Sequence, residues 1–225
     1  ERLRSDIDSL KLNLNFNFHI PEVRKDLSNL NMIVEGIVPG VPLKSIDDDE
    51  LKTKIYKDLQ VLIVQQIFAD GFFHADLHDG NIFYDKDTRT VSLIDAGFCT
   101  HISQDLQILI LNLLNGDDLE FTLQRYFASN TILVEKEIFS RFVDDIKEEK
   151  SLFGKMMKVQ DIFGQMNGVS CPSELTRVVA GLTKCAYIFD EFTLNLKDLT
   201  KQFSLARSIY SVSPYLVEKQ LSEFL

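Results

Sequence analysis

The sequence predicts a mainly α-helical fold with a small β part. Two observations lead to this expectation. From residue 103 onward, apolar side chains recur at steps of three and four residues, which is the period of helices that bury one face. Stretches with the alternating or short apolar pattern of strands are confined to the first hundred residues. We therefore expect a small strand-containing front and a large helical remainder.

The front begins with two expected strands. Residues 1–29 are polar and rich in Asn, but Phe16, Phe18 and Ile20 alternate as in a short strand. A second strand is expected over residues 30–38, where an apolar run ends at a Pro-Gly pair. Both would precede the first long helix.

That long helix is expected over residues 48–69. The acidic run at residues 47–50 supplies its start, because negative charge is favourable at a helix N-terminus. Leu51, Ile55 and Leu59 then open a series of apolar residues at helical spacing.

A β-hairpin is expected after this helix. A loop over residues 71–80 leads to a strand at 82–84, a turn at 85–88 and a second strand at 91–94. The remaining helices are expected at residues 103–114, 117–128 (with Asp117 as N-cap and Glu120 completing a capping-box-like pattern), 135–148, 151–166, 172–190 and 197–223.

Composition limits the class of protein. The chain has 225 residues, enough for one large domain or two small ones, and its 45% hydrophobic and 26% charged residues are typical of globular proteins. The net charge of −10 argues against a nucleic-acid surface, which needs clustered Lys and Arg. Three cysteines without metal-ligand spacing indicate a reducing compartment. No apolar run approaches the roughly 20 residues that span a bilayer. Because the chain starts without Met, we expect it to be part of a longer protein.

Three oxygen-bearing side chains stand at the ends of the expected hairpin. Asp76 lies in the loop before the first strand, Asn81 follows it just before that strand, and Asp95 ends the second strand. In phosphoryl transfer, one acid accepts the proton of the attacking group, while an amide oxygen and a second carboxylate hold magnesium on the nucleotide phosphates. The order and spacing therefore predict a kinase-like centre with Asp76 as base and Asn81 and Asp95 as metal ligands.

Each of these residues also has a structural interpretation. Asp76 could organise a turn through backbone hydrogen bonds, and Asn81 could form an Asx turn after Gly80. Asp95 is harder to explain in this way, because a charged residue at the end of a buried strand is costly unless it binds a cation or accepts good hydrogen bonds. Magnesium suits such a carboxylate.

The histidines of the loop leave alternatives open. His74, in an apolar setting, is expected to be a packed, hydrogen-bonded scaffold residue rather than a catalyst. His78 could approach a phosphate or face solvent. A zinc site built from His74, His78, Asp76 and Asp79 lacks a further Cys or His to complete it.

The two motifs resemble those of a known family. GFFHADLHDGNI at residues 71–82 and LIDAGF at residues 93–98 look like the catalytic and metal-binding loops of the UbiB/ADCK atypical kinases, also called aarF-domain kinases. A Phe-Phe-His-Ala-Asp run at this point is not typical of ordinary protein kinases. The resemblance covers residues 15–205 and is strong at residues 71–98.

The resemblance implies a protein-kinase-like fold that binds ATP with Mg²⁺. On this analogy the chain is mostly the C-terminal lobe, a catalytic-loop β-hairpin on a helical bundle, with the upper lobe largely missing. Residues 1–43 would be a remnant of the upper lobe and hinge, and residues 44–225 the helical lower lobe. Glu35 and Ile37, in a segment similar to the family's hinge, would contact the nucleotide together with His78.

The resemblance also implies a function. The family is associated with ATPase activity and with ubiquinone or other isoprenoid-lipid metabolism at membranes. We therefore expect an ATP- and Mg²⁺-dependent kinase or ATPase whose partners are a nucleotide and lipid or lipid-pathway proteins, without nucleic acid. The location implied is cytoplasmic or membrane-associated, and mitochondrial in a eukaryote. Protein substrates are disfavoured, because no Arg precedes Asp76 and no Ala-Pro-Glu segment follows the second motif.

Departures from the family pattern leave other functions open. Asp79 stands where the pattern has Pro, and Ala96 replaces a Phe that helps to set active and inactive states. The chain has no Gly- or Ala-rich nucleotide loop, no phosphate-binding Lys on an upper-lobe strand and no K-x-G-Q signature, which we expect to lie N-terminal to Glu1. The alternatives are a nucleotide-binding pseudokinase scaffold and a small-molecule kinase of the aminoglycoside or choline kinase type.

Overall fold

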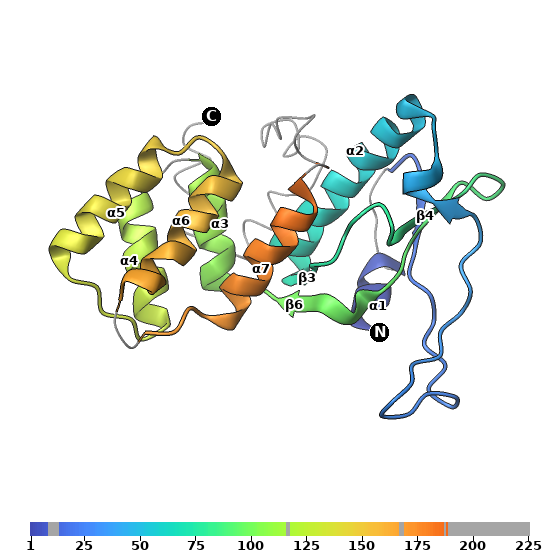
Figure 1. Cartoon of the computed structure of the whole chain (residues 1–225), viewed down its shortest axis with the longest axis horizontal. Helices are drawn as coiled ribbons and strands as arrows, with labels where there is room; N and C mark the ends of the chain where they lie inside the picture. Colours follow the sequence, from blue (N-terminus) through green and yellow to red (C-terminus); the bar gives the residue numbers. More distant parts are fainter. Residues whose placement is uncertain (9–13, 116–117, 167–168, 187, 189–225) are drawn as a thin grey trace, which may run out of the picture.

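The computed structural model describes residues 1–8, 14–115, 118–166, 169–186 and 188. This part of the chain is mainly helical and contains two small β-sheets, which confirms the expected class. The sheets and the first long helix occupy one end of the molecule, and most of the later helices form the other end (Figure 1).

The long helix α2 (Asp49–Gln65) forms as expected. The Asp48 side chain caps it by accepting a hydrogen bond of 3.0 Å from the backbone N–H of Leu51, one of the first-turn donors without a partner inside the helix. A π-helical turn, Gln66–Asp70, continues the helix, and Gly71 then adopts a left-handed conformation with φ 58°. Glycine takes this conformation without the steric cost of a Cβ, so the chain can turn directly into the next strand.

A four-stranded sheet contains the expected hairpin. Its strands are β1 (Asn17–His19), β2 (Val41–Pro42), β4 (Ile82–Asp85) and β5 (Thr90–Leu93), in the order β1–β5–β4–β2. β4 and β5 pair antiparallel with Ile82 opposite Leu93, whereas β1 runs parallel to β5. The hairpin and the strand around Phe18 are thus confirmed, and β2 was not expected.

A second sheet corrects the loop expected over residues 71–80. Phe72–His74 forms strand β3, which pairs antiparallel with β6 (Cys99–His101). The sequence did not predict this pairing, because both strands are short and the hairpin separates them. The pairing is extended by a hydrogen bond of 3.0 Å from the N–H of Ala75 to the carbonyl of Phe98, so the two motifs lie side by side.

Residues 21–40 form an extended ribbon, which corrects the strand expected over residues 30–38 (Figure 1). An isolated antiparallel bridge joins Val23 to Glu35. Ile37 is 99% exposed. An apolar run forms a strand when neighbouring strands pair with its backbone and one face is buried. Most apolar side chains of this run face solvent instead, and Val34 and Val38 are half-buried.

The rest of the described chain is helical. Helix α1 (Arg2–Asp8) precedes the sheets and was not expected. Three expectations fall outside the described residues: the Asp117 cap, residues 189–190 of the helix at 172–190, and the helix at 197–223. The later helices are α3 (Gln104–Asn115), α4 (Leu119–Ser129), α5 (Lys136–Glu148), α6 (Leu152–Gln165) and α7 (Ser173–Lys184). Their bounds lie close to the expected ones except at the end of α7, which was expected to reach residue 190 and instead ends at Lys184, with Cys185 as its C-cap.

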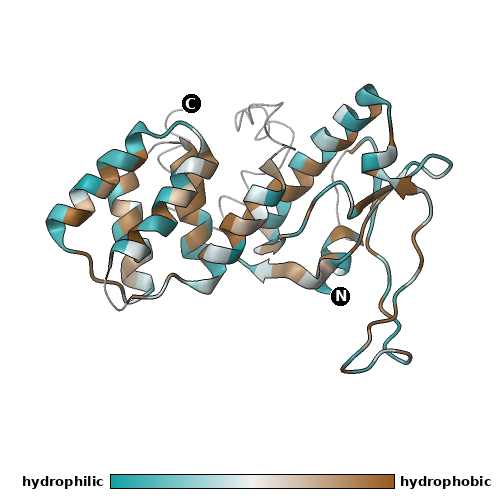
Figure 2. Ribbon diagram, viewed as in Figure 1, coloured by the Kyte–Doolittle hydropathy of each residue, from teal (hydrophilic) through white to brown (hydrophobic). Residues whose placement is uncertain are grey.

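The apolar faces of these helices turn inward (Figure 2). Their buried side chains form one continuous core with those of α2 and the hairpin. α7 contacts both α6 and β6, so it connects the helical end of the molecule with the sheets (Figure 1). Among the described residues, no helix combines the length and the hydrophobicity needed to cross a membrane.

Candidate functional site

His74 connects the two loops that carry the candidate residues. Its ring is fully buried, Nδ1 accepts a hydrogen bond of 3.2 Å from the backbone N–H of Asp76, and Nε2 lies 3.2 Å from the carbonyl oxygen of Ile94. Because Nδ1 accepts, a neutral ring carries its proton on Nε2 and donates it to that carbonyl. Burial lowers the pKa of the imidazole, whereas the Ile94 carbonyl and the carboxylates of Asp76 and Asp95 favour its charged form. His74 is therefore the packed scaffold residue that was expected.

Asn81 ties the same two segments together at the start of β4. Its side chain is buried, and Nδ2 donates a hydrogen bond of 3.1 Å to the carbonyl oxygen of Asp76. Its backbone carbonyl accepts a bond of 2.9 Å from the N–H of Ile94, which continues the β4–β5 ladder. Nδ2 is a donor and is bonded to the carbonyl of Asp76, whereas the amide oxygen is an acceptor with lone pairs. The oxygen is therefore the side-chain atom that can bind a cation.

Asp95 follows β5 in a left-handed backbone conformation, with φ 55° and ψ 54°. For a residue other than glycine this conformation costs on the order of 1–3 kcal/mol, and such strain concentrates at functional sites. The carboxylate is exposed, and a Cβ added at Gly97 would lie 3.3 Å from Oδ1. Glycine at this position therefore keeps space open beside the carboxylate.

Asp76, Asn81 and Asp95 thus lie on two adjoining loops linked by His74, while their roles as base and metal ligands stay predictions. An amide oxygen and a carboxylate suit Mg²⁺, which binds one or two protein oxygens together with phosphate oxygens. Within the described residues, no group of three or more His, Cys, Asp or Glu side chains is arranged to hold a metal ion, and this includes the alternative zinc set.

The two residues before Gly80 have local partners. His78 is exposed, and its Nδ1 accepts a hydrogen bond of 3.1 Å from the N–H of Gly80. Asp79 accepts hydrogen bonds of 3.0 and 3.1 Å from the hydroxyl of Tyr56 on α2. The carboxylate that replaces the family's Pro therefore helps to hold the loop on α2.

Glu35 and Ile37, the expected nucleotide contacts, are exposed on the ribbon of residues 21–40. The ribbon extends away from the two sheets (Figure 1). The contact of these two residues with a nucleotide therefore stays a prediction.

Sequence reasoning missed one residue at the site. Lys184, the last residue of α7, pairs its ammonium with Oδ1 of Asp76. Its Nζ also lies 5.4 Å from the ring centre of Phe98, which ends the second motif. The ion pair joins residues 108 positions apart, so no local pattern could reveal it.

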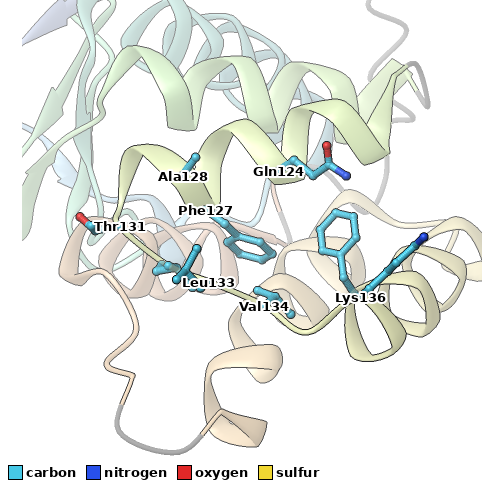
Figure 3. A pocket seen from close by; sticks show the side chains of 9 residues that line it. Gln124, Phe127, Ala128, Thr131, Leu133, Val134 and Lys136 are labelled. Atoms are coloured by element: carbon cyan, nitrogen blue, oxygen red, sulfur yellow. The ribbon is translucent and has the colours of Figure 1, made fainter.

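A pocket of about 500 Å³ lies at the helical end of the molecule (Figure 3). It is formed by the end of α4, the start of α5 and the segment between them, with Phe127, Leu133 and Val134 in its wall. None of the candidate residues lines it, so it is separate from the site around Asp76.

Three curated relatives align with only part of their length. An uncharacterized protein of Synechocystis sp. is 35% identical over 105 residues, which cover 42% of this chain and 25% of that protein. A probable protein kinase UbiB of Enterobacter sp. is 31% identical over 143 residues, covering 58% of this chain and 23% of the relative. Another, of Photorhabdus laumondii, is 26% identical over 228 residues, covering 96% of this chain and 36% of the relative. The chain thus spans about a quarter of the first two relatives.

A family model covers the front of the chain and both motifs. The ABC1 atypical kinase-like domain matches residues 1–118, just over half of the sequence. This match includes Asp76, Asn81 and Asp95, whose loops the fold places side by side. The chain therefore belongs to the UbiB/ADCK family of ABC1 atypical kinase-like proteins.

Proposed function

We propose that this chain is the lower-lobe part of an ATP- and Mg²⁺-dependent phosphotransferase or ATPase of the UbiB type. The observation that supports this most is the buried link through His74, which joins the loop of Asp76 to the strand end before Asp95. A phosphotransfer site needs a base and metal-binding oxygens at such a junction. The division into an upper-lobe remnant at residues 1–43 and a lower lobe belongs to the same proposal.

The proposed roles follow from the chemistry of each group. Asp76 accepts the proton of the attacking hydroxyl or water, which contributes roughly 10²- to 10⁴-fold in rate. Asn81 and Asp95 would hold Mg²⁺ through an amide oxygen and a carboxylate, and the ion would supply positive charge to offset that of the phosphates. His74 keeps the two loops in register through its hydrogen bonds to both.

The nucleotide base would bind on the side of the ribbon. In this proposal Glu35 and Ile37 contact the nucleotide, and His78 approaches a phosphate. The exposure of Ile37 and of its neighbour Ile33 suits a segment that packs against further parts of a longer protein.

We also propose a link to ubiquinone or other isoprenoid-lipid metabolism, with lipid or lipid-pathway proteins as partners. The supporting observation is the family resemblance of the two motifs, and the same resemblance supports a cytoplasmic or membrane-associated location, mitochondrial in a eukaryote. Two of the relatives are probable protein kinases UbiB, which supports phosphoryl transfer as the class of chemistry.

A nucleotide-binding scaffold without turnover is the second candidate. It is favoured by the ion pair of Lys184, which already occupies the carboxylate of Asp76, and by Ala96 in place of the family's Phe. In a scaffold that pair would persist when nucleotide binds.

ATP turnover by the full-length protein separates the two candidates. Asp76→Ala and Asp95→Asn are the test variants, and Asp87→Asn, an exposed carboxylate in the hairpin turn, is the matched control. The enzyme proposal expects the parent and the control to hydrolyse Mg-ATP above background, and each test variant to lose about 100-fold or more. If Mg-ATP raises the Tm of the parent but no mixture, with or without lipid, shows turnover, the scaffold is correct and the enzyme proposal fails.

A further inference from the structure

α7 lies directly on the loop that carries Asp76. A Cβ added at Gly181 would lie 2.5 Å from Cε1 of Phe73 and 2.6 Å from the Cβ of Ala75, so helix and loop touch through two small residues. Lys184 is almost one helical turn beyond Gly181 and meets the residue that follows Ala75 in the loop. The glycine contact therefore sets how closely this lysine approaches the site.

Contacts on either side of this point hold α7 in place. Glu174, in its first turn, accepts hydrogen bonds of 3.1 Å from the N–H and 2.5 Å from the hydroxyl of Ser103. Just beyond the helix, the carbonyl oxygen of Ile188 accepts a bond of 2.6 Å from Nε2 of Gln60 on α2. The position of Lys184 is therefore fixed by the packing of the helix and not only by the reach of a long side chain.

Lys184 places a positive charge against the proposed base. Its side chain is 45% exposed, whereas that of Asp76 is 16% exposed. Arg177 lies seven residues earlier on α7, hence on the same face, and its guanidinium carbon is 5.9 Å from the centre of the same Phe98 ring that Lys184 approaches. α7 thus presents two cations along the edge of the site.

Positive charge is otherwise scarce in the two motifs. They carry three carboxylates, at Asp76, Asp79 and Asp95, and a nucleotide triphosphate adds further negative charge. Lys86 and Arg89, the basic residues between these carboxylates in the sequence, belong to the turn at the far end of the hairpin. Positive charge for a triphosphate here would therefore come from Mg²⁺ and from other elements. Lys44 places its Nζ 4.0 Å from where a Cβ at Gly80 would lie, and Lys184 is paired with Asp76 itself.

We propose that Lys184 binds the terminal phosphate of the bound nucleotide and exchanges its ion pair with Asp76 for one with that phosphate. The inference rests on the proposed function. A phosphate carries more negative charge than a carboxylate and offers several acceptor oxygens, so an ammonium that can reach both favours the phosphate. The exchange also leaves Asp76 able to accept a proton when the phosphate is in place.

The test compares two nucleotides that differ by the terminal phosphate. Calorimetry with Mg²⁺ gives the Kd of the full-length protein for a non-hydrolysable ATP analogue and for ADP. Lys184→Met is expected to weaken the analogue about 10- to 100-fold and to leave ADP unchanged, because one charge-assisted contact is lost. Lys184→Arg should keep most of the affinity for the analogue, and Lys86→Met, a lysine of the hairpin turn, should match the parent.

Each other outcome has a definite meaning. Unchanged affinities, or equal weakening for both nucleotides, overturn the role of Lys184 while the proposed function stands, because the parent still binds. A parent that binds neither nucleotide contradicts the proposed function and this inference with it. ADP binding by Lys184→Met shows at the same time that the variant is folded.

Discussion

The loop and hairpin at residues 72–101 and the ribbon at residues 21–40 are opposite cases within one end of the molecule. In the first region, His74 and Leu93 are completely buried, and hydrogen bonds from the buried side chains of His74 and Asn81 join its segments. In the second region, apolar side chains such as Ile37 face solvent. The metal-and-phosphate half of the proposed site is therefore held by contacts within the chain. The ribbon, which carries the residues expected to contact the nucleotide base, leaves apolar side chains such as Ile37 exposed instead of burying them against the described residues.

Replacing one apolar residue of each region by alanine tests this difference between the regions. Of the predictions made here, it has the largest expected effect on the free energy of unfolding. Leu93→Ala removes a fully buried side chain of β5 and should lower the free energy of unfolding by about 2–5 kcal/mol. In the same 225-residue chain, Ile37→Ala on the ribbon should change it by no more than about 0.5 kcal/mol. Urea denaturation measures both values. A loss for Ile37→Ala close to that of Leu93→Ala would show that the ribbon is packed after all.

Alanine substitutions at two helical glycines test whether α7 packs tightly against the first region. Gly181→Ala should destabilise by about 1–3 kcal/mol, because the new methyl group collides with Phe73 and Ala75. Gly164→Ala on α6 is the matched control, since its Cβ would meet nothing within 4 Å, and it should stabilise by about 0.5–1 kcal/mol. Thermal unfolding of the two variants decides between these signs. Stabilisation by both would mean that α7 does not press on the loop.

The smallest expected effect is the contribution of His74 to the change of the free energy of unfolding with pH. Burial lowers the pKa of His74 below its usual 6.5, so the unfolded chain gains a proton more readily than the folded chain as pH falls from 7.5 to 5.5. The free energy of unfolding should therefore decrease over this range, by at most about 1.4 kcal/mol per pH unit from this group. His74→Gln should have a shallower pH dependence in urea titrations.

Two partly buried carboxylates also contribute to the pH dependence of stability, and they do so equally in the parent and in His74→Gln. Burial raises the pKa values of Asp58 and Asp70, which gives the opposite sign, with stability lost as pH rises through their range. Because these residues are unchanged in His74→Gln, the difference between the two slopes isolates the imidazole. Identical slopes would mean that His74 is not held neutral by its surroundings.

Local patterns were sufficient to predict much of the fold. The acidic run before α2 became its cap at Asp48, and the turn residues between β4 and β5 produced the hairpin. The order of Asp76, Asn81 and Asp95 was visible for the same reason, because the hairpin between them fixes their separation. Signals of this kind depend on residues a few positions apart.

Contacts between distant segments could not be predicted. β3 pairs with β6 across the whole hairpin, and Lys184 meets Asp76 across 108 residues, so both depend on how complete elements pack. The expected strand at residues 30–38 failed for a related reason. Its apolar run had the composition of a strand, but strand formation also needs neighbours that bury one face.

The central claim is that Asp76, Asn81 and Asp95 surround one metal–phosphate position. The most direct test is a crystal structure of the full-length protein with Mn²⁺ in place of Mg²⁺ and a non-hydrolysable ATP analogue, with the ion located by anomalous scattering. We predict an ion within about 2–2.5 Å of the Asp95 carboxylate and the Asn81 amide oxygen, with the terminal phosphate beside Asp76. A nucleotide-bound ion that contacts neither Asn81 nor Asp95 would contradict the claim.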